Sequence, residues 1–129
     1  MAKSFEIESE FYAAGLRCVV IAQDMGFRCG YVAVPEGHPW YNLDCKYLED
    51  VDVHGGVTYS GFGHPIDSGE FFIGFDCAHS GDANDPKILV DSKITADSER
   101  FHLPGSHIWT KGEVIQETTR LAQQVRDNG

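Results

Sequence analysis

The sequence lacks any long hydrophobic run. Its longest apolar stretches, residues 18–22 and 71–75, contain five residues each. A membrane-spanning helix needs about 20 such residues, so we expect none and no membrane partner. The first ten residues also lack the basic start and apolar stretch of a secretory signal. The sequence therefore predicts a cytoplasmic protein.

Positive charge is scarce. The chain has 10 Lys and Arg against 20 Asp and Glu, a formal net charge of −10, and no two basic residues are adjacent. Binding to DNA or RNA requires a basic surface, so we expect no nucleic-acid polymer as partner. The acidic balance is compatible with high solubility, with binding of cations, or with mimicry of a nucleic-acid surface.

Metal and nucleophile motifs are also lacking. No two cysteines are spaced as C-x-x-C, which disfavours a zinc ribbon. No H-E-x-x-H and no G-x-S-x-G occurs, which argues against a zincin and a serine hydrolase of the nucleophile-elbow type. We therefore expect no metal and no other cofactor. The cysteines are interpreted as reduced thiols, most of them buried in strands: Cys18, Cys29, Cys45 and Cys77.

A sheet with one helix accounts for most of the chain. At 129 residues and 42% hydrophobic content, we expect a single domain over residues 1–129. Runs of alternating or apolar residues predict five strands, at 4–11, 16–23, 29–34, 51–60 and 70–77.

A C-terminal helix follows these strands. Thr110 and Glu113 match a capping box, and apolar residues at helical spacing follow them. The sequence therefore predicts an α+β fold, an antiparallel sheet of about five strands with one amphipathic helix packed on a face.

Residues 51–59 (VDVHGGVTY) form the most informative segment. As a strand, this segment places its valines and Tyr59 on one face and Asp52, His54 and Thr58 on the other. Gly55 and Gly56 leave a gap beside that polar face, where a ligand or another backbone can approach closely. The polar face is a candidate ligand site, and the alternative is a solvent-facing strand with a glycine bulge.

Residues 74–82 (GFDCAHSGD) carry the second candidate site. Asp76 ends an apolar strand, so its carboxylate requires a hydrogen bond or a charge partner. His79 and Asp82 follow in the next loop. Because successive strands usually pair, His54 and Asp76 are expected to be neighbours. The alternative is that Asp76 only caps the turn that follows.

This constellation is compatible with three chemistries. A metal site would use His54, His79 and the carboxylates of Asp76 or Asp82, but no ligand spacing supports it. General acid–base catalysis would use a histidine oriented by an aspartate. Non-covalent recognition would use the same groups and glycine amides to hold a polar small molecule.

Two cations and one aromatic residue extend the candidate site. Arg17 and Arg28 lie on or beside neighbouring strands and are the cations best placed to meet a phosphate. Trp40 lies in a proline-bounded loop, where it would stack on a base or close a pocket. The alternatives are solvent-facing arginines and a tryptophan that covers the open end of the sheet.

The order of three blocks resembles a family of small uncharacterised proteins of bacteriophage and prophage genomes. The blocks are GYVAVPEGHP at residues 30–39, DVHGGVTY at 52–59 and GFDCAHSGD at 74–82, followed by the C-terminal helix. Residues 88–107 look longer than the corresponding stretch of the family. The family's motif residues fall here on His54, Thr58, Tyr59, Asp76, His79 and Asp82.

The resemblance implies a role in a phage-infected bacterial cytoplasm. Small acidic phage proteins of sheet-plus-helix form include inhibitors of bacterial immunity, which sequester or cleave cyclic nucleotide or cyclic ADP-ribose signals. The leading hypothesis is therefore a homo-oligomeric protein that sequesters a nucleotide-derived ligand. One alternative is a phosphodiesterase with His54 and His79 as acid and base beside Asp76. The other is an acidic protein–protein inhibitor without a pocket.

Overall fold

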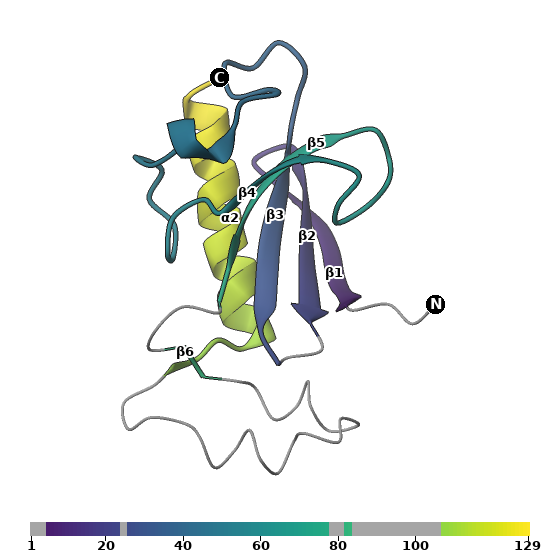
Figure 1. The fold of residues 1–129 in the computed structure, drawn as a ribbon, viewed down its shortest axis with the longest axis vertical. Coiled ribbons are helices and arrows are strands. Elements are labelled where there is room, and N and C mark those ends of the chain that lie inside the picture. The colour runs from purple at the N-terminus through teal and green to yellow at the C-terminus, as the bar shows by residue number, and fades with distance from the viewer. Residues whose placement is uncertain (1–4, 24–25, 78–81, 84–106) are drawn as a thin grey trace.

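The computed structural model describes residues 5–23, 26–77, 82–83 and 107–129. Figure 1 shows the elements in their order along the chain. They are β1 (Phe5–Ala13), β2 (Leu16–Gln23), β3 (Arg28–Val34), the short 3-10 helix η1 (Cys45–Tyr47), β4 (Tyr59–Phe62), β5 (Phe71–Asp76), β6 (Asp82–Ala83), β7 (His107–Ile108) and helix α2 (Lys111–Asp127).

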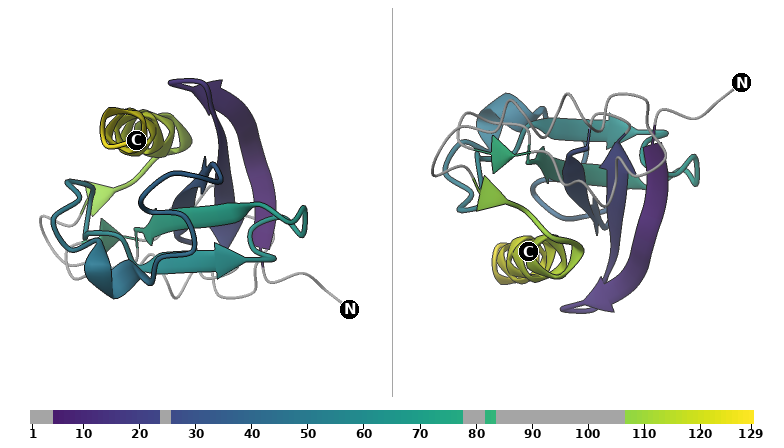
Figure 2. Two further views of the ribbon diagram at one scale, coloured as in Figure 1. Left: turned by 90° about the horizontal axis from the view of Figure 1, so that it is seen from above. Right: turned by 90° about the horizontal axis from the view of Figure 1, so that it is seen from below.

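The main sheet has five strands in the order β1-β2-β3-β5-β4, and every neighbouring pair is antiparallel. Helix α2 packs on one face of it, and the two views of Figure 2 show the sheet curving beside the helix. β6 and β7 form a separate parallel pair. The predicted α+β fold, an antiparallel sheet with a C-terminal helix on one face, is confirmed.

Helix α2 begins at the predicted capping box. The Thr110 hydroxyl accepts a hydrogen bond from the amide of Glu113 at 3.3 Å, and the Glu113 carboxylate accepts one from the amide of Thr110 at 3.2 Å. Among the described residues, no helix is long and apolar enough to cross a membrane. The predicted stripe is buried in full, and consists of Val114, Thr118, Leu121, Ala122 and Val125.

Each face of the sheet has its own hydrophobic core. Between the sheet and α2, the larger core also takes in residues of the long segment 35–58, among them Leu48, Val51 and Val53. The smaller core, on the other face, is centred on Tyr31 and Phe72 and is covered in part by the loop that follows β4. Both faces are therefore closed over much of their area, and functional groups are confined to the ends and edges.

Strand β1 does not keep all its acidic residues on one outer face. A bulge between Ile7 and Ser9 shifts the register against β2. Glu8 consequently turns to the buried Arg28, while Ile7 is 42% exposed. A bulge adds one residue to a strand, so the alternation of faces reverses beyond it.

Candidate functional site

Thr58 and Asp76 form a polar pair where β5 ends. The other five residues of β5 are buried, and Asp76 is partly exposed. Just ahead of β4, the amide of Thr58 donates to the carbonyl of Gly74 at 2.9 Å. The Thr58 hydroxyl donates to Oδ2 of Asp76 at 3.3 Å. Of the predicted strand 51–60, the part from Thr58 onward lies beside β5, and it brings Thr58 and Asp76 together, whereas the expected neighbour of Asp76 was His54.

Residues 51–58 do not form the predicted strand, so the polar face expected from strand alternation is absent. Gly55 and Gly56 both have positive φ, 68° and 79°, and the amide of Gly56 donates to the carbonyl of Val53. A tight turn therefore replaces an extended strand. Positive φ is open to glycine at little cost, and the Gly-Gly pair has this effect here rather than forming a bulge.

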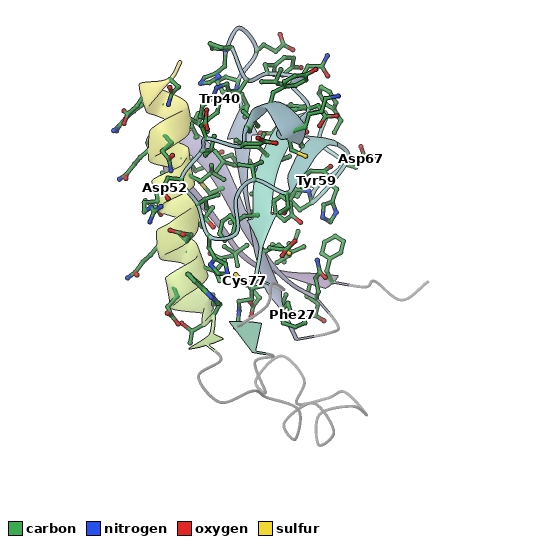
Figure 3. The ribbon with its side chains drawn as sticks, turned by 60° about the vertical axis from the view of Figure 1, so that its left-hand side comes forward. Phe27, Trp40, Asp52, Tyr59, Asp67 and Cys77 are labelled. Atoms are coloured by element: carbon green, nitrogen blue, oxygen red, sulfur yellow. The ribbon has the colours of Figure 1, made fainter. Side chains whose placement is uncertain are left out.

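Asp52 and His54 instead form hydrogen bonds or ion pairs with residues of helix α2. The Asp52 carboxylate forms an ion pair with Arg120 at 3.1 Å, and its backbone exchanges two hydrogen bonds with the side-chain amide of Gln124. The amide of His54 donates to Glu117 at 2.8 Å. Figure 3 shows Asp52 beside the helix, away from Cys77, which follows Asp76.

The imidazole of His54 lies against the indole of Trp109. The ring centroids are 4.2 Å apart and the planes are inclined by 34°. Trp109 was not among the predicted site residues. Its signal is present nonetheless: an apolar residue directly before an N-cap commonly packs against the fourth helical residue, here Val114, and both belong to the larger core.

Arg28 connects these two parts of the site. Its guanidinium, only 4% exposed, donates to both carboxylate oxygens of Glu8 at 2.6 and 3.3 Å and to the carbonyl of Trp109 at 3.0 Å. Its own carbonyl accepts the amide of Cys77 at 2.9 Å. Arg28 therefore ties the end of β5 to the start of α2, with its charge compensated by Glu8.

Arg17 lies at the opposite end of the sheet, near the start of β5. It forms ion pairs with Glu70 at 2.8 Å and with Glu10 at 3.4 Å. It also lines an open groove of about 540 Å³ between the β1–β2 turn, the end of β3 and the start of β5. The two arginines predicted to meet phosphate thus occupy different ends of the fold.

Trp40 packs against the larger core. Its amide donates to Nδ1 of His38 at 2.9 Å, and Nε2 of His38 lies 2.6 Å from the carbonyl of Val125 near the end of α2. Figure 3 places Trp40 far from Cys77, at the other end of the molecule. In this position Trp40 helps attach the long segment to the helix.

An aromatic cluster lies on the face of the sheet opposite α2. Of its residues, only Tyr59 was a predicted site residue. Tyr31, Tyr59 and His64 meet edge to face, and the Tyr31 hydroxyl lies 3.0 Å from Nε2 of His64. Burial raises the pKa of Tyr31 and of Tyr59 and lowers the pKa of His64. Gly74 makes room for the cluster, since a Cβ there would overlap the ring of Tyr31.

Cys29 lies next to this cluster and is not poised as a nucleophile. Burial is the main cause that raises its pKa from 9.0 to about 11, and the charge of Asp76 adds to the effect. A thiol with so high a pKa is almost entirely protonated at neutral pH and reacts slowly. Cys18, Cys29 and Cys77 are free and buried, and Cys45 is free and partly buried.

Two candidate positions fall wholly or partly beyond the structural description. His79 lies outside the described residues, as do residues 88–106 of the stretch that departs from the resembled family. The backbone of Asp82 belongs to β6, paired with His107 of β7. Within the described ranges, no group of three His, Cys, Asp or Glu residues could hold a metal ion.

Comparison with known proteins identifies no relative. No family model, curated protein or solved structure matches the chain. The chemistry of the site is therefore inferred from the residues and geometry of this chain alone. One end of the sheet presents a carboxylate–hydroxyl pair and a tilted imidazole–indole pair, and the other end presents a groove that contains Arg17.

Proposed function

We propose that the protein binds a nucleotide-derived small molecule, without converting it, at the end of the sheet where β5 terminates. The observation that carries this proposal is the gathering of the Thr58–Asp76 pair and the His54–Trp109 ring pair at that end. Three segments far apart in the sequence contribute these residues, since His54 and Thr58 belong to the same one. Arg28 bonds to the backbone of both Cys77 and Trp109 and so supports the arrangement.

The carboxylate–hydroxyl pair suits the sugar of a nucleotide. Asp76 is partly exposed and Thr58 is exposed, so both reach solvent. An ionised carboxylate accepts hydrogen bonds from ribose hydroxyls, and hydrogen bonds to a charged group are stronger than neutral ones. The Thr58 hydroxyl already donates to Asp76, so its oxygen remains an acceptor.

The ring pair suits the base. Nucleobases stack on indole and imidazole rings irrespective of base identity, which is worth about 1–3 kcal/mol per base. Two residues after His54, nothing lies within 4 Å of the position where a Cβ on Gly56 would be. A planar ligand can therefore approach the backbone closely beside the rings.

In biological terms, we propose sequestration of a cyclic nucleotide or cyclic ADP-ribose immune signal by a phage-type protein in the cytoplasm of a bacterial host. This matches the implication of the motif resemblance, and the acidic, compact chain is suited to a freely diffusing binder.

We also propose a homo-oligomer, because the edge strands expose Ile7 on β1 and Phe62 on β4, at 42% and 48%. Light scattering at micromolar concentration should give at least twice the mass of one chain, and a monomer contradicts this part.

The test is recovery of intact ligand. The purified chain is incubated with cyclic dinucleotides or with cyclic ADP-ribose and separated from free ligand. It is then heated, and the released compound is identified by chromatography. Intact ligand supports sequestration. Converted ligand contradicts it and favours a phosphodiesterase, and no retained ligand with any probe contradicts both.

A matched pair of variants locates the site. Asp76→Asn should weaken binding about tenfold, because it removes a charged acceptor from the ligand. Asp67→Asn is the control, because Asp67 is exposed on the loop between β4 and β5, well away from Cys77 (Figure 3). Equal affinities of the two variants would mean that the ligand does not bind at the end of β5.

A further inference from the structure

The groove that contains Arg17 has the dimensions of a small-molecule site. Its volume is about 540 Å³, and small-molecule pockets in proteins commonly span about 300–1,000 Å³. Its principal side chains come from the β1–β2 hairpin, the segment after β3 and the approach to β5: Tyr12, Arg17, Glu36, Tyr41, Ser68 and Glu70.

The electrostatic balance of this groove is negative. Glu36 and Glu70 line it with Arg17, and Glu10 lies within 3.4 Å of the same guanidinium. Three carboxylates therefore lie in or beside the groove, together with the cation of Arg17. The Arg17 side chain is 28% exposed, and its two ion pairs already direct its guanidinium to Glu70 and Glu10. A phosphate here would meet repulsion from the carboxylates, whereas a cation would complete the charge balance.

Aromatic walls favour the same class of ligand. Tyr12 is 76% exposed, and Tyr41 is held against Phe62 and Phe71 with ring centroids 5.9 and 5.6 Å away. Tyrosine rings attract organic cations through the negative electrostatic potential of their faces. A groove with tyrosines and carboxylates together recognises a charged nitrogen attached to an apolar chain.

We infer that this groove binds a small organic cation, an alkyl amine or alkyl guanidine, through Glu36 and Glu70 and the rings of Tyr12 and Tyr41. The site is independent of the nucleotide site, because it lies at the opposite end of β5. The cation competes with Arg17 for Glu70, so Arg17 tunes affinity and is not an anchor for the ligand.

Calorimetric titration of the full chain with agmatine tests the inference. We expect saturable binding that weakens about fivefold in Glu36→Gln and in Glu70→Gln, since each removes one solvent-accessible ion pair with the ligand. Glu49→Gln is the matched control, because Glu49 is exposed and does not line the groove. No binding, or equal weakening by Glu49→Gln, would overturn the inference.

Arg17→Gln gives the sharpest test, because its effect has a sign. The variant should bind agmatine more tightly, since it removes a competing cation from Glu70. Unchanged or weaker agmatine binding, or binding of adenosine monophosphate in the groove that Arg17→Gln abolishes, would show that Arg17 anchors an anion and would overturn the inference.

A peptide probe identifies the source of the cation. Agmatine should bind more tightly than the tripeptide Gly-Arg-Gly, because a groove of this size fits a free small molecule. Tighter binding of the tripeptide would overturn that assignment in favour of an arginine side chain of a partner protein. Asp76→Asn should leave agmatine binding intact, which separates this inference from the proposed nucleotide site.

Discussion

At the scale of single residues, Arg28 differs most from its expected role. An arginine beside a strand was expected to meet a phosphate, and its guanidinium is engaged within the fold by Glu8 and the carbonyl of Trp109. Sequence alone does not reveal this pairing, because the partners are 20 and 81 positions away. Only the fold decides whether a charge faces solvent or another residue.

Arg28→Met should reduce the free energy of unfolding by about 3 kcal/mol, because it leaves Glu8 without its partner in a largely desolvated pair. Urea unfolding measures the change. Arg126→Met is the control, since Arg126 is 58% exposed and, among the described residues, forms its ion pair with its sequence neighbour Asp127. That control should stay within about 0.5 kcal/mol of the parent, and equal losses in the two variants would contradict a structural role for Arg28.

Among secondary-structure elements, helix α2 was the best predicted. Its cap and its buried stripe depend on neighbours three and four residues apart, so they can be read directly from the sequence. Residues 51–58 were poorly predicted, because valines at alternate positions are equally compatible with a strand and with a loop that docks two valines into the core. The Gly-Gly turn and the contacts with α2 decide between these structures.

The close approach of α2 to the sheet depends on Gly30. A Cβ at this position would overlap the Thr118 hydroxyl and lie 2.7 Å from the ring of Phe75. Gly30→Ala should therefore cost about 2 kcal/mol of stability through overpacking, measured by urea unfolding. Gly112→Ala is the matched control: its Cβ would have nothing within 4 Å, so stability should stay equal or rise slightly. Similar effects in both variants would mean that α2 does not rest on Gly30.

At the scale of the whole molecule, the two cores determine how stability depends on pH. Burial raises the pKa of Cys18 and of Cys29 from 9.0 to about 11. The folded chain therefore keeps these protons to higher pH than the unfolded chain, which ionises first. The contribution of these two thiols to stability is therefore fully present below pH 9, and it is lost as the pH rises toward 11.

Urea unfolding at pH 8 and pH 10.5 should show a loss of roughly 4 kcal/mol over this interval. The double variant Cys18→Ala and Cys29→Ala should show a flatter profile, whatever its stability at pH 8. A parent profile that stays level up to pH 10.5 would mean that these thiols are not protected by burial.

The net charge of −10 acts on any anionic ligand. Salt screens this repulsion, since the screening length falls from about 10 Å at 0.1 M to about 3 Å at 1 M. Nucleotide affinity should therefore rise about twofold between 0.05 and 0.5 M NaCl, whereas agmatine affinity should fall. Opposite salt dependences in calorimetry would support two sites of different character, and a fall for the nucleotide would indicate a basic site that the proposal lacks.

The sequence by itself determined the α+β fold, the helix with its cap, and four of the five strands of the main sheet, because these depend on local periodicity and on neighbours a few residues apart. It predicted His54 as the neighbour of Asp76, whereas the structure shows Thr58 bonded to Asp76, since the segment before β4 follows the pairing of β4 with β5. Tertiary structure alone decided that His54 turns to Trp109 and Asp52 to Arg120, and that Arg17 and Arg28 stand at opposite ends. Such choices depend on which distant groups reach each charge or ring once the cores have packed, and no local pattern encodes them.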